Sequence, residues 1–312
     1  MKTLYPHDIG QSNIGATVVT IGNFDGVHRG HQQIFALVQD CARQNEATSL
    51  VVTFEPHPLT VIAPASAPTR ITSLPEKERL IAASGIDCLL VIPFTREFSA
   101  TPAREFVTGT LLNGLHMTHL FIGYDYAFGR NREGDVTLLQ QLAQEHDFKI
   151  HVVDPIGNDD TIFSSSAVRR QVLCGEVADV ADLLGRPYAL TGTVIHGREI
   201  GRGIGFPTAN IATDAELVPA DGVYAVTVEM DGIHHDAACS ISNNPTFGGV
   251  HRSIEVFLLD FQGDLYGKKL CVSFMERVRG IISFPDAASL VRQITEDIKS
   301  CREILSKTRK TA

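Results

Sequence analysis

Two histidines near the N-terminus, His28 and His31, have the type and spacing for phosphate chemistry. They lie in the segment IGNFDGVHRGH, residues 21–31, between a β-branched run and a helical pattern. In an open α/β sheet such a junction binds nucleotides, because the backbone amides at a helix start present positive charge to phosphate. The two imidazoles could donate hydrogen bonds to one phosphate as its negative charge builds up during a reaction.

The residues alone leave two other interpretations of this pair open. The histidines could be helix-start residues without a role, or half of a metal site, although no third ligand stands at a suitable spacing. The preceding strand pattern, the turn Asp25-Gly26 and the flanking glycines favour phosphate binding. The nucleotide-binding residues predicted in this segment are Gly22, Phe24, Asp25, Gly26 and Gly30.

Two further segments of the first half carry groups suited to a flat ring and its phosphates. They are TFEPHP, residues 53–58, and GYDYAFG, residues 123–129, which an arginine follows directly. A histidine between prolines is equally typical of a turn, and paired aromatic rings suit either a core or a bound flavin or adenine. The arginine suits either a phosphate clamp or a solvated loop. The candidate flavin-binding residues are His57, Pro58, Asp125, Tyr126, Phe128 and Arg130.

A run of hydroxyl side chains opens the last helical stretch of the first half. Ser164, Ser165 and Ser166 precede this stretch, and Arg169 follows about one turn later. Hydroxyls and free amides at a helix start, together with an arginine, would form a cradle for an anion. Serine is also a common helix cap, so a purely structural role fits the same residues.

The second half contains a glycine-rich segment, GRGIGFPTAN, residues 201–210. It lacks the G-K-[ST] ending of a Walker loop, and Pro207 excludes the helix that a dinucleotide fingerprint requires. The segment could therefore be a plain flexible loop or a phosphate-binding loop of another kind. Further along, Glu255 is a lone carboxylate in an apolar strand pattern. It could accept a proton from a hydroxyl group or simply face solvent.

The elements that position the first-half residues follow an alternating pattern. Apolar runs alternate with helical spacing at residues 76–83 and 136–146, which predicts a parallel sheet covered on both faces, a doubly wound, Rossmann-like α/β domain. The predicted strands cover residues 16–22, 49–54, 88–94, 119–123 and 149–153.

After Gly185 the pattern changes to consecutive strands joined by hairpin turns, which predicts an antiparallel β-barrel. One helix ends the chain, with an apolar stripe from Val291 to Leu305. We therefore predict two domains, residues 1–185 and 186–312. The predicted barrel strands cover residues 188–199, 223–230, 233–241, 253–261 and 265–274.

Composition limits the class of protein. A length of 312 residues suits two domains, and 44% hydrophobic with 20% charged residues indicates a folded globular chain. The net charge of −9 argues against nucleic acid as a partner, and the absence of ~18 consecutive apolar residues argues against a membrane span. Six scattered cysteines without a C-x-x-C pair and no signal peptide favour the cytoplasm. Composition does not determine the oligomeric state.

These motifs resemble two enzyme modules. The string IGNFDGVHRGHQ is similar to the flavin branch of the H-x-G-H nucleotidyltransferase superfamily, the prokaryotic FAD synthetase module, and the segments at 53–58, 123–129 and 164–169 agree with its motifs in order and spacing. GFPTAN and residues 253–267 resemble the riboflavin kinase module. The chain departs from the family pattern at Ser166, which replaces a threonine, at Phe257, which replaces a histidine, and in SISNNPTF, residues 240–247.

The resemblance implies a bifunctional enzyme. Its kinase would move the γ-phosphoryl group of ATP onto riboflavin, with Glu255 as base, Mg²⁺ on Thr208 and Asn210, and the loop of Gly201, Gly203, Gly205 and Pro207 around the phosphates. Its nucleotidyltransferase would join FMN to a second ATP, giving FAD and pyrophosphate, with His28, His31 and Arg169 stabilising charge. Riboflavin, FMN and ATP would be substrates, and no tightly bound redox cofactor is required.

Two rival functions fit parts of the same pattern. A flavoprotein that binds FMN or FAD for electron transfer would also use aromatic and glycine-rich segments. An RNA-binding or non-enzymatic relative of the H-x-G-H proteins is disfavoured by the charge of −9.

Overall fold

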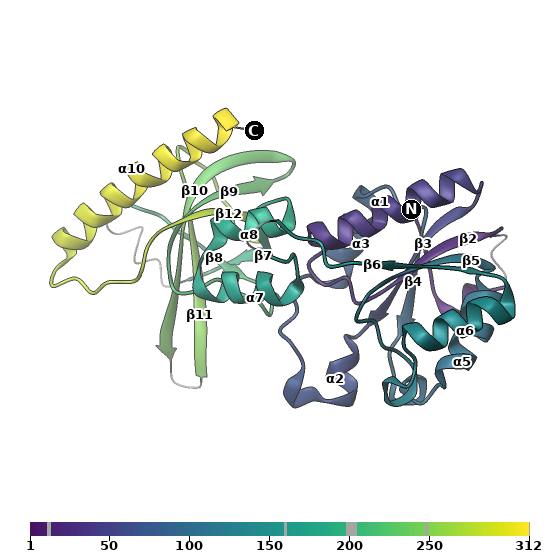
Figure 1. Ribbon diagram of the computed structural model, residues 1–312. Coiled ribbons are helices and arrows are strands. Elements are labelled where there is room, and N and C mark those ends of the chain that lie inside the picture. The colour runs from purple at the N-terminus through teal and green to yellow at the C-terminus, as the bar shows by residue number, and fades with distance from the viewer. Residues whose placement is uncertain (11–13, 159–160, 198–204, 247–248, 312) are drawn as a thin grey trace. The chain divides into compact units, whose positions relative to one another are not determined.

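The computed structural model describes residues 1–10, 14–158, 161–197, 205–246 and 249–311, and these form two compact units, Met1–Ser165 and Ser166–Ala312 (Figure 1). The helices α7 (Ser165–Cys174) and α8 (Val177–Leu184) group almost entirely with the second unit. The division of activities at residues 185 and 186 therefore differs from the division of contacts, and it stays a prediction.

The first unit is built on a six-stranded parallel sheet, which confirms the doubly wound α/β prediction. Its strand order is β1-β4-β3-β2-β5-β6. The sequence pattern missed β1, because its three residues form too short a run to read. The strands are β1 (Lys2–Leu4), β2 (Thr17–Ile21), β3 (Thr48–Glu55), β4 (Cys88–Pro93), β5 (Met117–Gly123) and β6 (Lys149–Val153).

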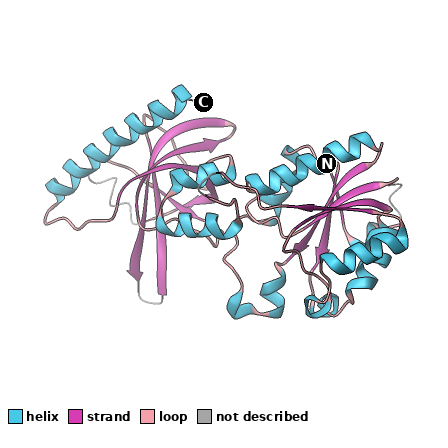
Figure 2. Cartoon of the chain, viewed as in Figure 1, coloured by secondary structure: helices cyan, strands magenta, loops and turns pink. Residues whose placement is uncertain are grey.

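Helices cover both faces of this sheet, as Figure 2 shows. Neighbouring residues of β2 alternate between two cores: Val18 packs with α1 and α3, whereas Val19 packs with η3 and α6. Buried apolar residues on both faces are the reason for the near-continuous apolar strand runs. The helices are α1 (Arg29–Gln44), α2 (Pro58–Ile62), α3 (Leu74–Ala83), α4 (Arg96–Ser99), α5 (Ala103–Glu105), the π-helical η3 (Phe106–Gly114) and α6 (Val136–His146), with short 3-10 turns η1 (Pro6–Asp8), η2 (Pro64–Ser66) and η4 (Arg130–Arg132).

The second unit is a closed antiparallel barrel with the order β10-β11-β8-β7-β12-β9, which confirms the predicted barrel. The C-terminal helix α10 (Ala287–Thr311) packs on the barrel through Cys301 and Leu305, which lie against Ala225. The strands are β7 (Tyr188–Ile195), β8 (Ala209–Ala212), β9 (Gly222–Met230), β10 (Ile233–Thr246), β11 (Gly249–Leu258) and β12 (Lys269–Arg279).

Several predicted barrel strands have different ends in the structure, and β10 continues to Thr246 beyond its predicted end at residue 241. The strand predicted to reach residue 199 ends at Ile195, and residues 198–199 lie outside the described part. The strand β11 ends at Leu258 because Asp260 has a left-handed φ of +58°. The strand β12 begins at Lys269 rather than Leu265, because the turn continues through Gly267 with its φ of +73°. No helix in the described ranges is long and apolar enough to cross a membrane.

Candidate active sites

The loop between β2 and α1 has an unusual backbone. Phe24 and Val27 both have left-handed φ angles, +46° and +42°, and Gly26 has φ +82°. Such conformations are costly for residues other than glycine and persist where the surrounding structure holds them. Both Phe24 and Val27 are buried in the core beneath α1, so apolar packing holds this loop in place. The loop delivers the next residue, His28, to the N-cap of α1.

The two histidines predicted to bind phosphate lie together. Their rings stack with centroids 3.5 Å apart and planes 25° from parallel, and Phe24 packs edge-on against His31 at 5.1 Å. A side chain at Gly30 would meet the His28 ring at 3.1 Å and the carbonyl oxygen of Phe163 at 3.3 Å. The glycine between the histidines therefore permits the close packing of this ring pair.

The electrostatic environment keeps His31 uncharged. Burial lowers its pKa well below 6.5, and His28 and Lys77 lower it further by charge repulsion. Its Nδ1 is enclosed and has no hydrogen-bond partner in the part of the chain that the structure describes. A neutral ring with one unmatched nitrogen at a helix start is suited to an incoming anionic group.

Asp25 anchors this loop to a distant segment. Its carboxylate accepts hydrogen bonds from the backbone amides of Ile71 and Thr72, at 3.1 and 3.0 Å, and from the Thr72 hydroxyl at 3.2 Å. The same hydroxyl accepts a hydrogen bond from the Gly26 amide at 3.1 Å. These contacts show that Asp25 holds the loop in place. Its predicted role in nucleotide binding stays a prediction.

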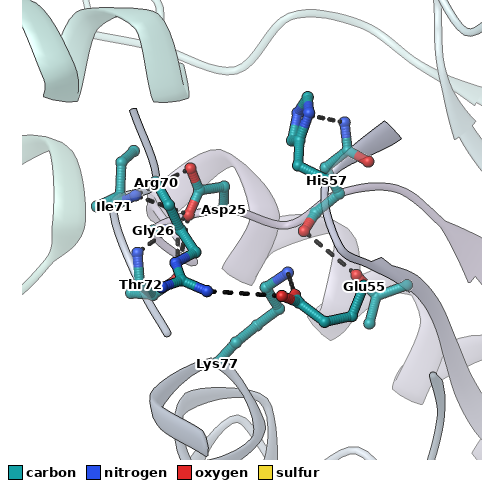
Figure 3. A network of polar contacts seen from close by, with 10 residues as sticks. Asp25, Gly26, Glu55, His57, Arg70, Ile71, Thr72 and Lys77 are labelled. Atoms are coloured by element: carbon teal, nitrogen blue, oxygen red, sulfur yellow. Dashed lines mark hydrogen bonds and ion pairs between the residues drawn. The ribbon is translucent and has the colours of Figure 1, made fainter. Parts of the chain in front are cut away.

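A buried cation lies beside this anchor, as Figure 3 shows. Lys77 on α3 is only 4% exposed, and its Nζ lies 3.9 Å from the carboxylate of Glu55, which Arg70 approaches from the other side at 3.6 Å. Burial lowers the pKa of Lys77, while Glu55 and Asp25 act in the opposite direction. The sequence pattern did not predict this network. A signal existed, because Lys77 shares the apolar helical spacing of Leu80 and Ile81.

The predicted flavin-binding residues line a cavity of about 520 Å³ in the first unit. Tyr126 and Phe128 stack with centroids 5.4 Å apart, and the buried Tyr126 hydroxyl lacks a hydrogen-bond partner among the described residues. The His57 Nδ1 accepts a hydrogen bond from the Leu59 amide at 3.2 Å. Of the predicted set, His57, Pro58, Asp125, Tyr126 and Phe128 line the cavity and Arg130 does not, whereas Phe54, Phe94, Phe98, Phe106 and Arg132 line it without having been predicted.

The serine run reaches the same loop. The Ser165 hydroxyl donates a hydrogen bond to the Asp25 carbonyl oxygen at 2.9 Å, so the start of α7 is tied to the segment before α1. Ser164 is partly buried, whereas Ser166 is exposed. Arg169 lies on α7 in the part that groups with the second unit, and its assignment to adenylylation stays a prediction.

The predicted kinase residues meet on adjacent barrel strands. Glu255 on β11 pairs with Asn210 on β8, and the Thr208 hydroxyl donates to the Glu255 carboxylate with 3.2 Å between Oγ1 and Oε2. The Ser253 hydroxyl donates to the other carboxylate oxygen at 3.1 Å. All three predicted residues line a second cavity, of about 720 Å³. Glu255 therefore faces this cavity and not bulk solvent.

Other residues shape this second cavity. Phe257, the departure from the family pattern, packs edge-on against Phe206 at 5.8 Å. A Cβ at Gly197 would fall 2.0 Å from the Asn210 amide nitrogen, so this glycine makes room for the Asn210 side chain. Among the predicted loop residues, Gly205 has a left-handed φ of +91°. Pro207 lies between Phe206 and Thr208, while Gly201 and Gly203 lie outside the described residues.

Comparison with known proteins shows which family the chain belongs to. The model of the family described as FAD synthetase matches residues 10–167, and the riboflavin kinase model matches residues 184–305. The bifunctional riboflavin kinase/FMN adenylyltransferase of Escherichia coli K12 is 38% identical over 306 residues, which cover 97% of each chain. The chain belongs to the bifunctional riboflavin kinase/FMN adenylyltransferase family.

A second curated relative agrees with this assignment, and a solved structure of another description has a similar fold. The bifunctional riboflavin kinase/FMN adenylyltransferase of Listeria monocytogenes is 35% identical, covering 98% of this chain and 99% of its own. A solved structure described as a macrolide-efflux protein from Streptococcus pneumoniae is 31% identical, with a TM-score of 0.87, and covers 97% of this chain and 99% of its own. The elements of both units are thus similar to those of a solved structure.

A bifunctional riboflavin kinase/FMN adenylyltransferase phosphorylates riboflavin with ATP to give FMN and then joins FMN to AMP from a second ATP, releasing pyrophosphate. Riboflavin, FMN and ATP are its small-molecule substrates. The enzyme interpretation of the sequence is confirmed over that of an electron-transfer flavoprotein.

Proposed function

We propose that the two activities are divided between the two cavities, each carried by its own residues. In the first unit the FMN phosphate attacks the α-phosphorus of ATP beside His28 and His31. Their imidazoles lie at the start of a helix and donate hydrogen bonds to oxygens that gain charge as the P–O bond to pyrophosphate breaks. Ser164 and Ser165, the last residues of this unit, contribute further donors to the same phosphates.

The flavin ring occupies the aromatic cavity of the first unit. The cavity volume of about 520 Å³ and the stacked pair Tyr126 and Phe128 support this placement of the flavin, since a flat ring system packs well between aromatic faces. The unpartnered Tyr126 hydroxyl is suited to a polar atom of the ring edge. Arg132 lines the same cavity and supplies a cation for the FMN phosphate.

In the second unit Glu255 takes the proton from the ribityl 5′-hydroxyl of riboflavin as that oxygen attacks the γ-phosphorus of ATP. The contact between Thr208 and Glu255 is the single observation that carries this assignment. Thr208 and Asn210 offer a hydroxyl and an amide oxygen, the hard donors that Mg²⁺ prefers, so both would hold the ion. When bound, Mg²⁺ neutralises the charge of the ATP phosphates.

We also propose that the enzyme works in the cytoplasm. All six cysteines are free thiols in the structure, which suits a reducing compartment.

Complementation between two inactive variants tests the division of activities. His31→Ala should stop at FMN and Glu255→Gln should fail to phosphorylate riboflavin, so neither alone should convert riboflavin to FAD with ATP and Mg²⁺. An equimolar mixture should restore FAD, because FMN released by one variant reaches the other. Chromatography of the flavins measures each step. If the mixture forms no FAD although both variants are folded, or if either variant alone makes FAD at the normal rate, the proposed division is wrong.

A further inference from the structure

A cluster of candidate metal ligands lies in the first unit, away from the histidine pair His28 and His31 of its candidate active site. It consists of Cys41 on α1, His119 on β5 and His151 on β6. The Cys41 Sγ and one ring nitrogen of each histidine all lie within 4.8 Å of one another. Cys41 stands about 15 Å along α1 from His31, at the helical rise of ~1.5 Å per residue.

The fold brings these side chains to one place by strand alternation. His119 and Phe121 point to the same face of β5, and the adjacent strand places His151 over Phe121, with ring centroids 4.2 Å apart and planes 11° from parallel. His119 lies beside His151 at 5.6 Å. Cys41 packs against the apolar core on this same face, which contains Val38 and Phe121. The cluster is therefore a polar group of side chains at the margin of an apolar layer.

The hydrogen-bonding pattern leaves ligand atoms available. The Nε2 of His151 is buried and has no hydrogen-bond partner in the described residues. His119 uses Nδ1 in a 3.1 Å contact with the Thr118 hydroxyl, which leaves its Nε2 for another partner. The Cys41 thiol has a long contact of 3.6 Å with the Asn45 amide. A buried polar atom without a partner is uncommon, and a bound ion is one explanation for it.

Burial and a nearby lysine act on the ionisable groups of the cluster. Burial lowers the pKa of His119 and of His151, the charge of His151 lowers that of His119 further, and Lys149 acts on both in the same direction. Burial raises the pKa of the Cys41 thiol, and Lys149 acts against this. A metal ion would displace the thiol proton on binding, as it does at other thiolate sites.

We propose that Cys41, His119 and His151 bind one Zn²⁺ ion, with water as the fourth ligand. One thiolate and two imidazoles form a borderline-soft set that suits zinc and not the hard Mg²⁺ ion. Tetrahedral bonds of ~2.0–2.3 Å place ligand atoms ~3.3–3.7 Å apart. Side-chain rotations that move each ligand atom by about 1 Å therefore complete the site. The ion ties the C-terminal part of α1 to β5 and β6, and it stabilises the helix that begins at the catalytic histidines.

Cobalt titration of the full-length protein tests the site directly. We expect Co²⁺ to bind metal-free protein in the presence of excess Mg²⁺, with one equivalent giving a thiolate-to-cobalt charge-transfer band and the visible bands of tetrahedral cobalt. Zn²⁺ should displace it and raise the melting temperature. Cys41→Ser should abolish the charge-transfer band, and His151→Phe, which keeps a ring against Phe121, should weaken binding at least ~10-fold.

Matched variants separate this site from other thiols and histidines. Cys174→Ser and His146→Asn change exposed residues outside the cluster and should leave the cobalt spectrum unchanged. All four variants should keep both flavin activities, which shows that each is folded. An octahedral cobalt spectrum without the thiolate band, or a thiolate band that survives Cys41→Ser, would overturn the proposal.

Discussion

The hydroxyl of Thr208 donates a hydrogen bond to the carboxylate of Glu255, with 3.2 Å between the two oxygens. One residue precedes the short strand β8 and the other lies on its neighbour β11, so the pairing of these two strands brings a predicted metal ligand and a predicted base into contact. Groups that touch in this way act as a unit, and substitutions of both are expected to be less than additive.

Glu255→Gln should reduce riboflavin phosphorylation ~10²-fold or more, because glutamine keeps the shape but cannot accept a proton. FAD formation from supplied FMN should stay near that of the unchanged enzyme. Steady-state assays of the two half-reactions measure this. Glu229→Gln, an exposed glutamate on β9, is the control and should change neither rate. More than about a tenth of the normal kinase rate in Glu255→Gln would remove this residue from the base role.

His31→Ala should reduce FMN adenylylation ~10²-fold or more, since a donor that stabilises developing charge is commonly worth ~3 kcal/mol. Riboflavin phosphorylation should persist. The exposed His146→Ala serves as control in the same assays. Equal loss of both activities in a folded His31→Ala variant would contradict a separate adenylylation site.

Neutral His31 should make the protein less stable in acid. Its pKa is lowered in the folded state, so below pH ~6.5 the unfolded chain takes up a proton that the folded chain does not. The contribution of neutral His31 to the free energy of unfolding is complete above pH ~6.5. It is lost as the pH falls from there toward the lowered pKa of the folded state. Urea unfolding at pH ~7.5 and at pH ~5 gives the loss of unfolding free energy between the two pH values. This loss should be smaller for His31→Gln than for the unchanged protein. Identical differences would show that His31 does not contribute.

Lys77→Met should destabilise the protein by about 2 kcal/mol, because it leaves the Glu55 carboxylate with one fewer cation in a partly buried site. It should also slow adenylylation, since the same network holds the Asp25 loop. The double variant Lys77→Met/Glu55→Gln should recover part of the stability. Lys2→Met, at an exposed position of β1, is the control. The midpoints of urea unfolding compare the stabilities of these variants. A double variant less stable than Lys77→Met would count against a stabilising ion pair between Lys77 and Glu55.

Two fragments compare the predicted domain boundary at residues 185 and 186 with the boundary between the compact units at residues 165 and 166. Residues 186–312 and 166–312 both contain Thr208, Asn210 and Glu255, so both should convert riboflavin to FMN and neither should make FAD from FMN. The longer fragment should be more stable, because it keeps α8, which packs on β12 and β7 and buries Val180 and Leu184. Chromatography and urea unfolding test both points. A folded fragment that forms FAD would refute the assignment of adenylylation to the first unit.

Sequence patterns predicted the elements whose burial is regular. Both ends of β6 and of α6 agree with the apolar run and the helical spacing, whereas the roles predicted for His28, His31 and Glu255 stay predictions. The strand β8 was missed because its four residues directly follow a glycine-rich loop motif. Short elements at a motif carry too few residues for a period to emerge.

The missed site residues depend on contacts across the sequence. Glu55 and Arg70 meet only because the segment between them returns to the end of β3, and no local pattern encodes that return. The anchoring of Asp25 by backbone amides of residues 71 and 72 is equally invisible, because amides carry no sequence signature. Lys77 could have been identified, since a lysine on an apolar helix stripe requires a buried partner.

The closure of the barrel has a consequence for aggregation. Because β9 pairs with β10, each barrel strand in the described ranges has a neighbour on both sides for part of its length, which leaves little open edge for an extended segment of another chain. The sheet of the first unit is open and ends in β1 and β6. These edge strands span only Lys2–Leu4 and Lys149–Val153, and each begins with a lysine. Short strands with a charge at the edge resist edge-to-edge association, so each unit opposes it by a different means.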